Sequence, residues 1–348
     1  MILPVFSGRK SAAGCKKLAA FFLLIFISIS SLSGEALPFV LGGKVYTVNE
    51  DYFVEQMLEQ GGFTLRSVCK SEKNGYVLAW NQKSELLCHI DETGKIASRC
   101  SLKASSVFIN GEYILTQSNN FDENKGFRLD LYKIKYSAFS AKLKLKSIWH
   151  GYADCFVSDC FFMDDGICIA GGTRDNLKHG VYKITAKGIH KCFSMPKNSD
   201  FLRIIPISKD KKQVIAFVSG RDKSEAKPLI YEFNVENTKG LEGAETISLD
   251  RLNGFPEDFD CFFGYGFEYE KEVIIPASLK GEISFIKYNP ENKLLTGIVN
   301  EAIGCNYPLG KMKNGFCYIA RDPLIDNSYY GLAVYNGKEI IKPCDFRQ

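Results

Sequence analysis

Residues 165–192, DGICIAGGTRDNLKHGVYKITAKGIHKC, contain the pattern that decides the fold. In order, they read as a tight turn, an apolar strand, a polar loop, an alternating strand, a second turn and a further strand. The Asp165-Gly166 pair is typical of the type I′ turn that joins two antiparallel strands. The stretch therefore predicts two consecutive β-hairpins.

The turn and the apolar strand recur along most of the chain. Each copy marks the start of the second strand of a hairpin, and copies begin at Asn74-Gly75, Asn110-Gly111, Asp165-Gly166 and Asn314-Gly315. Two variants, at residues 211–216 and 270–275, lack the glycine. An alternating strand, a turn and one more strand follow each copy. Alternation with a period of two indicates that one face of each strand is buried.

Two hairpins per unit, with units recurring every 36 to 59 residues, match a four-stranded propeller blade. Six units are clear, and residues 39–70 supply either a seventh or a strand that closes the ring. The last unit reads as three strands that stop at Lys342 or Pro343, so we expect the amino-terminal segment to complete it. A β-sandwich pair would cycle less evenly, and a solenoid repeat would be shorter. Only residues 51–60, DYFVEQMLEQ, predict a helix.

On these repeats, the chain resembles β-propellers in general over about residues 39–348, the architecture that WD40 and YVTN proteins share. It lacks the WD dipeptide and the kelch and Asp-box signatures. The resemblance implies an all-β fold, a β-propeller of six or seven four-stranded blades, preceded by a signal peptide. No function follows from this architecture alone.

The amino terminus has the features of a secretory signal peptide. Basic residues precede an apolar run at 18–29, and small residues follow it. The run is short for a membrane span, which needs roughly 20 residues. We expect residues 1–36 to be a signal peptide, with an uncleaved anchor or a lipoprotein site at Cys15 as alternatives. Residues 37–348 would then form a single β-propeller domain in the bacterial periplasm, cell envelope or extracellular space, with no membrane span after cleavage.

Composition excludes some classes of partner and site. The formal net charge is +4 with the basic residues spread out, so no nucleic-acid partner is expected. Eleven of the twelve cysteines lie beyond the leader, and several sit in apolar strands where a thiol packs as a small hydrophobe. We expect mainly buried thiols, with one or two disulfides as the alternative. No zinc-site spacing occurs.

The hairpin turns are short, whereas the connections between hairpins are long and polar, for example at residues 117–126, 171–179, 219–227 and 321–328. The face with the long loops is therefore the candidate binding face. Three of these loops carry an arginine followed by an aspartate: Arg174, Asp175, Arg221, Asp222, Arg321 and Asp322. Converging arginines could hold a carboxylate or phosphate group. The alternative is that each pair only stabilises its own turn.

Acidic and aromatic residues precede several innermost strands and should lie near the mouth of the central channel. The candidates are Asp154, Asp258, Asp260 and Tyr307. Clustered carboxylates could ligate Ca²⁺, the only cofactor that we consider, or act as an acid/base pair. They could equally form an acidic surface turn. No nucleophile elbow, Walker or dinucleotide motif is present.

These features favour an exported, non-catalytic binding scaffold that takes a protein or carbohydrate partner. A propeller hydrolase or lyase that uses acidic residues at the channel mouth is the alternative. A structural part of an envelope assembly is a third possibility.

Overall fold

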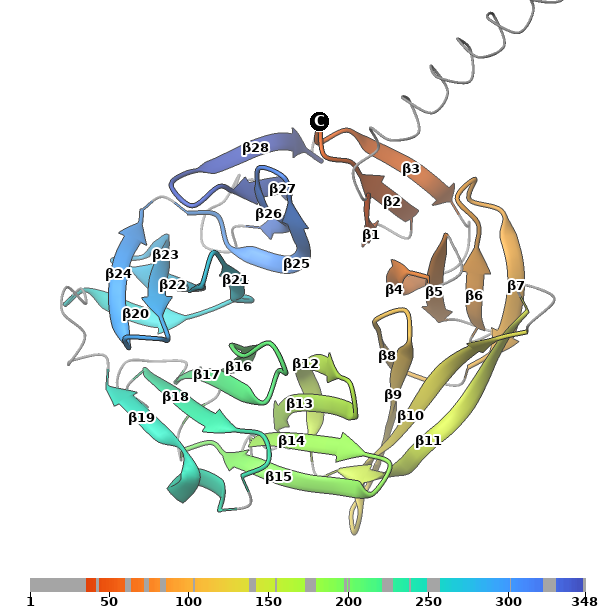
Figure 1. Cartoon of the computed structure of the whole chain (residues 1–348), viewed down its shortest axis with the longest axis horizontal. Coiled ribbons are helices and arrows are strands. Elements are labelled where there is room, and N and C mark those ends of the chain that lie inside the picture. Colours follow the sequence, from red (N-terminus) through yellow and green to blue (C-terminus); the bar gives the residue numbers. More distant parts are fainter. Residues whose placement is uncertain are drawn as a thin grey trace, which may run out of the picture.

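The computed structural model describes residues 36–41, 44–59, 64–71, 75–81, 86–102, 104–137, 142–153, 155–172, 180–196, 199, 201–220, 228–237, 239–248, 257–300, 302–321 and 330–346. They form seven antiparallel sheets that follow one another around a ring (Figure 1). The chain is therefore a seven-bladed β-propeller, as the repeats predict.

We number the blades in chain order. Blade 1 contains β1 (Leu37–Leu41), β2 (Lys44–Val48) and β3 (Val54–Glu59), and blade 2 contains β4 (Thr64–Lys70), β5 (Tyr76–Asn81), β6 (Leu86–Ile90) and β7 (Ile96–Ser101). Blade 3 contains β8 (Ser106–Ile109), β9 (Tyr113–Asp122), β10 (Gly126–Tyr136) and β11 (Leu143–Ala153). Blade 4 contains β12 (Phe156–Met163), β13 (Gly166–Gly172), β14 (Gly180–Thr185) and β15 (Gly188–Ser194).

Blade 5 contains β16 (Phe201–Pro206), β17 (Gln213–Ser219), β18 (Leu229–Asn234) and β19 (Glu245–Ser248), with the short 3₁₀ helix η1 (Gly240–Gly243) before β19. Blade 6 contains β20 (Phe259–Phe262), β21 (Phe267–Tyr269), β22 (Glu272–Leu279), β23 (Glu282–Asn289) and β24 (Leu294–Val299). Blade 7 contains β25 (Cys305–Met312), β26 (Gly315–Arg321), β27 (Tyr330–Tyr335) and β28 (Ile340–Asp345).

Each recurring turn precedes the second strand from the inside of its blade, which confirms the hairpin prediction. Gly75 and Gly111 have φ angles of 82° and 90°, a left-handed conformation that favours glycine. The variant turns use lysine and glutamate instead, because Lys211, Glu270 and Lys271 have φ angles of 57°, 50° and 72°. The backbone geometry of the turn is thus kept where its glycine is not.

Apolar side chains fill the interfaces between blades. Seven buried clusters lie in the described residues, one between each pair of neighbouring blades, including the pair formed by blades 7 and 1. In that last cluster Phe39 packs with Leu332 and Val334, and its ring centroid lies 6.0 Å from that of Phe346. Residues near the two ends of the described chain therefore close the ring by packing, as burying apolar surface favours.

The prediction for how the ring closes is wrong in its mechanism. Blade 7 has four strands of its own, because β28 continues through Pro343. A proline is tolerated there since β28 is an outer edge strand. Blade 1 has three strands among the described residues instead. Its β2–β3 turn lies beside the β25–β26 turn, where the backbone N–H of Lys313 donates to Glu50 Oε2 over 2.6 Å. β1 lies on the inner side of blade 1 and contacts β4 and β25, the innermost strands of the neighbouring blades (Figure 1).

The helix predicted at residues 51–60 is also wrong, because Val54–Glu59 form β3. The side chain of Asn49 accepts hydrogen bonds from the backbone N–H groups of Asp51 and Phe53, and Tyr52 has a φ angle of 62°. These contacts form a tight turn that returns the chain along β2. Side-chain-to-backbone bonds of this kind compete with a helix.

Candidate binding surfaces

Two faces of the ring differ in their connections. Short turns join first to second strands and third to fourth strands, as at 164–165 and 186–187, and they lie on one face. Connections from second to third strands and from blade to blade lie on the opposite face, the long-loop face. The loops with the Arg-Asp pairs follow β13, β17 and β26, the second strands of their blades. Arg321, the last residue of β26, is exposed. Arg174, Asp175, Arg221, Asp222 and Asp322 lie outside the described residues.

The acidic residues near the channel mouth have structural partners. Asp260 accepts hydrogen bonds from Ser278 Oγ (3.1 Å) and from the backbone N–H of Gly281 (2.9 Å). Asp258 pairs with Lys280 Nζ at 2.8 Å. Lys280 and Gly281 both have positive φ angles, 54° and 81°, so the two carboxylates stabilise the tight β22–β23 turn.

The remaining channel-mouth candidates are Tyr307 and Asp154. Tyr307, on β25, is 48% exposed, and Asp154 lies outside the described residues. In the part of the chain that the structure describes, no group of three or more His, Cys, Asp or Glu residues is arranged to hold a metal ion. Asp258 precedes β20 and Asp260 lies in it, and both carboxylates support the β22–β23 turn of their own blade.

A carboxylate that the sequence did not single out lies on the innermost strand of blade 4. Asp159 accepts hydrogen bonds from the backbone N–H of Cys160 (2.9 Å) and of Ile204 (3.0 Å), the latter in blade 5. Burial raises the pKa of the Asp159 carboxyl to about 6, although the charge of Arg203 opposes the shift. The Arg203 guanidinium lies 4.6 Å from the ring centroid of Tyr265 in blade 6. The group thus joins three consecutive blades beside the central channel.

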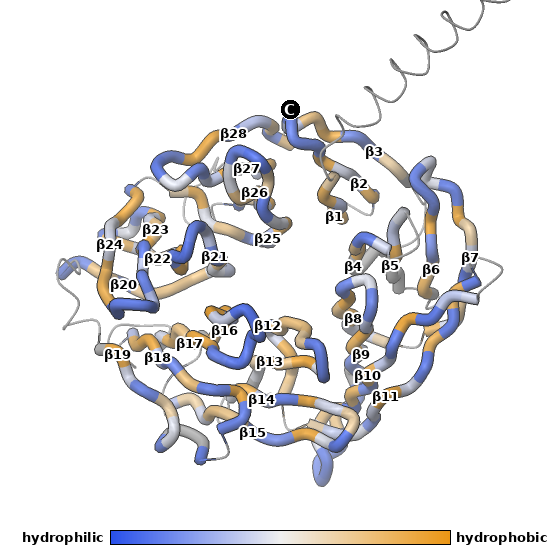
Figure 2. The backbone as a smooth tube through the Cα atoms, in the orientation of Figure 1, coloured by the Kyte–Doolittle hydropathy of each residue, from blue (hydrophilic) through white to orange (hydrophobic). Residues whose placement is uncertain are grey.

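The hairpin of β9 and β10 is longer than the sequence predicts. Residues 117–126 read as a polar loop, but strand pairing continues to Asp122, and only residues 123–125 form the turn. Asp122 Oδ1 caps this turn by accepting the N–H groups of Asn124 and Lys125. The hydrophilic tip of the hairpin reaches the outer rim of the ring in Figure 2.

Aromatic side chains gather around this hairpin. Phe121, Tyr152 and Phe156 are 38%, 40% and 43% exposed. Buried Phe127 lies between two of them, with ring-centroid distances of 5.0 Å to Phe121 and 5.7 Å to Phe156. Lys125 Nζ lies 5.5 Å from the ring centroid of Tyr152. We call Phe121, Lys125, Tyr152 and Phe156 the hairpin patch.

A groove of about 540 Å³ opens beside the same hairpin, between the outer end of blade 2 and one face of blade 3. Arg128, Asp130 and Tyr132 line its wall because alternate residues of β10 point to the same face. Arg128 Nε and Nη2 donate to the Asp130 carboxylate at 3.2 Å. Hydrogen bonding to Asp130 raises the pKa of Arg128 further, so the guanidinium stays charged.

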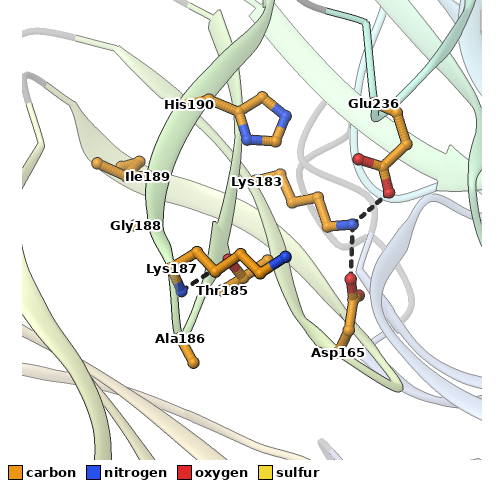
Figure 3. A pocket seen from close by; sticks show the side chains of 9 residues that line it. All are labelled: Asp165, Lys183, Thr185, Ala186, Lys187, Gly188, Ile189, His190 and Glu236. Atoms are coloured by element: carbon orange, nitrogen blue, oxygen red, sulfur yellow. Dashed lines mark hydrogen bonds and ion pairs between the residues drawn. The ribbon is translucent and has the colours of Figure 1, made fainter.

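A second cavity, of about 650 Å³, lies on the short-turn face between blades 4 and 5 (Figure 3). Lys183 is the buried cation there. In an alternating strand such as β14, a charged residue is instead expected on the exposed face. Its Nζ donates to Asp165 at 2.8 Å and to Glu236 at 2.6 Å. Burial lowers the pKa of Lys183, but the hydrogen bonds and charges of these carboxylates outweigh it, so the pKa is raised. Because Glu236 belongs to blade 5, the three residues join two blades and are a structural clamp.

Six of the eleven cysteines in the described residues are buried and the other five are partly buried. All eleven cysteines in the described part of the chain are free, and Cys88, Cys168 and Cys317 are buried. Burial raises the pKa of Cys88 to about 12, so this thiol stays protonated and unreactive. Cys88 is therefore not a candidate nucleophile.

Comparison with known proteins supports the fold alone. No protein-family model matches the chain, and no curated protein matches its sequence. Among solved structures it is similar to a protein of unknown function from Desulfotomaculum acetoxidans, at 15% identity and a TM-score of 0.54, over 88% of this chain and 94% of that one. It is similar to a provisionally assigned 6-phosphogluconolactonase from Bacteroides uniformis, at 13% identity and a TM-score of 0.53, over 89% and 96%. It is also similar to the Dos1 propeller, at 10% identity and a TM-score of 0.51, over 89% and 79%.

Proposed function

We propose that the chain is an exported, non-catalytic binding scaffold and that the hairpin patch binds a protein partner. The grouping of exposed aromatic side chains carries this proposal. Seven large hydrophobic residues are exposed among the described ones, and three of them surround a single hairpin. The other four are scattered singly over four different elements, as is usual for soluble proteins. Aromatic and arginine side chains supply most of the binding energy in protein interfaces.

The charge beside the patch is mixed, because Asp122, Glu123 and Lys125 all lie at the hairpin tip, and the basic residues of β11 lie mainly towards its other end. β11, which carries Tyr152, exposes Lys144, Lys146 and His150 and contains no carboxylate. Lysines on an outer strand also discourage pairing with other strands. Lysines that contact the partner would make the affinity for it fall as salt is added, whereas lysines that only prevent strand pairing would not.

Catalysis at the channel mouth has less support. Asp258 and Asp260 hold a turn of their own blade, and Asp159 binds backbone N–H groups of neighbouring strands. A general acid or base must face the reacting group of a substrate. The described acidic residues have structural partners instead, so we favour the scaffold over a hydrolase or lyase.

Export follows from the leader-like sequence and is part of the proposal. We propose that residues 1–36 are removed as a signal peptide and that the propeller acts in the periplasm, the envelope or outside the cell. No helix in the described residues is long and apolar enough to cross a bilayer.

A pull-down from envelope extract, followed by purification of the captured protein and calorimetric titration, tests the proposal. The substitution pair Phe121→Ser and Phe156→Ser should weaken binding of the purified partner at least tenfold. Phe53→Ser and Ile341→Ser, at exposed residues on other elements, are the matched controls and should leave the affinity unchanged. Equal affinities for the patch variant and the wild-type protein would refute the patch as the binding surface.

A further inference from the structure

The groove between blades 2 and 3 is a separate site from the hairpin patch. It is about 540 Å³ in volume, within the range of ligand pockets. β7 and the residue after it, Leu102, form one side, and β9 and β10 form the other. No residue of the hairpin patch lines it, although Tyr152 of the patch is the cross-strand neighbour of Arg128 in the groove wall.

The polar groups of the groove have no net charge. The Arg128 guanidinium gives two of its five N–H groups to Asp130, through Nε and Nη2. The Asp130 side chain is only 13% exposed, whereas that of Arg128 is 55% exposed. The remaining N–H groups of Arg128 therefore lie beside carboxylate oxygens of Asp130. A charged ligand would have to displace one member of this ion pair, whereas a neutral ligand leaves the pair intact.

A ligand that both donates and accepts hydrogen bonds matches this arrangement. Hydroxyl groups do so, since each has one donor and two acceptor sites. Tyr132, half-buried in the wall, provides an aromatic body with a polar tip, and burial raises the pKa of its hydroxyl, which stays a donor. Leu102 and Leu145 supply apolar surface next to these polar groups. The lining therefore combines hydrogen-bond donors and acceptors that carry no net charge with adjoining apolar surface.

We infer that this groove binds a neutral carbohydrate. The sugar hydroxyls would bond to the Arg128–Asp130 pair, and the apolar side of the ring would lie against Tyr132. The ion pair, held together by its own hydrogen bonds, is arranged before the ligand arrives, which lowers the cost of binding.

Saturation-transfer NMR and calorimetry on the chain lacking residues 1–36 test the inference. The probes are cellobiose, maltotriose, xylotriose and mannobiose as neutral sugars, and digalacturonic acid as a charged one. At least one neutral probe should show saturation transfer and bind more tightly than digalacturonic acid. Absence of transfer from all four neutral probes, or tighter binding of the acid, would overturn the inference.

A substitution that changes the charge of the groove distinguishes specific recognition of a neutral sugar from non-specific binding. Asp130→Asn keeps the shape of the side chain but leaves Arg128 without its counter-charge. It should weaken the neutral sugar about tenfold and strengthen digalacturonic acid. Tyr132→Leu should weaken the neutral sugar similarly, whereas Lys187→Ala, beside the distant cavity of blade 4, is the control. Unchanged sugar binding in both groove variants, with melting temperatures near that of the wild type, would contradict the site.

Discussion

Asp159 makes the stability of the ring depend on pH. Its pKa is about 6 in the folded protein, against an ordinary value of 3.8 for an aspartate in water, and burial is the main cause. Between these values the folded protein binds more protons than the unfolded chain does. Stability must therefore fall as the pH rises through this window. This is opposite to the behaviour of a carboxylate whose pKa is lowered by folding.

The size of the effect follows from the shift. A shift of about two pH units corresponds to about 3 kcal/mol at about 1.4 kcal/mol per unit. Asp159 keeps some exposure, so this figure is an upper bound. Asp159→Asn removes the charge but can keep one of the bonds from Cys160 and Ile204.

Denaturant unfolding of the two proteins at pH 4.5, 6 and 7.5 measures this difference. The free energy of unfolding of Asp159→Asn minus that of the wild type should increase with pH, by up to about 3 kcal/mol. Other titrating groups cancel in the subtraction because both proteins contain them. A difference that is constant from pH 4.5 to 7.5 would refute the assignment of a buried, charged Asp159.

Three further predictions concern the clamp, the leader and the Arg-Asp loops. Lys183→Ala should lower the free energy of unfolding by about 2 kcal/mol or more, because the side chain that it removes is almost completely buried; Lys183→Met, which keeps the packing, should cost less, because water solvates the half-exposed carboxylates of Asp165 and Glu236, and a neutral result for Lys183→Ala in denaturant titration would contradict the clamp. Mass spectrometry of the exported protein should find an amino terminus near Gly34 or Leu37, and an intact Met1 would contradict cleavage. Single alanine substitutions of Arg174, Arg221 and Arg321 should shift stability by about 0.5 kcal/mol or less while weakening partner retention at low salt; unchanged retention in all three would make these residues ordinary turn ion pairs.

The sequence predicted the features of the fold that depend on local residues. Asn-Gly and Asp-Gly pairs mark turns because the required φ angles belong to the turn residues themselves. The copies at Asn74 and Asn110 therefore located second strands correctly, and so did the lysine-containing variant at 211–216. Alternation then supplied the remaining strands, and the period of the units gave the propeller.

Features that depend on neighbouring blades could not be predicted in this way. Residues 51–60 have a composition that suits a helix, but the turn capped by Asn49 pairs β3 with β2. Pro343 suggested an end to the last unit, because its place on an outer edge strand is visible only in the assembled sheet. The polar residues from Gln117 to Asp122 resembled a loop, yet they continue β9 and hold the hairpin patch away from the ring.

Among the candidate site residues, sequence reasoning did not predict the contacts. It identified Asp258 and Asp260, whose partners Lys280 and Ser278 are about twenty residues away in sequence. It missed Asp159, although a carboxylate within the apolar run VSDCFF was a signal of a buried charge. Arg128 and Asp130 occur as alternating residues of one strand, a pattern that is too common to indicate a groove without the adjoining blade.

Hydrogen–deuterium exchange of the free protein and of its complex with the purified partner tests the central claim most directly. The account predicts slower exchange on binding at residues 119–127 and 150–157, which carry the hairpin patch. It predicts no change at the short turns at 164–165 and 186–187 on the opposite face. Protection confined to those turns, with residues 119–127 unchanged, would contradict the proposed binding surface.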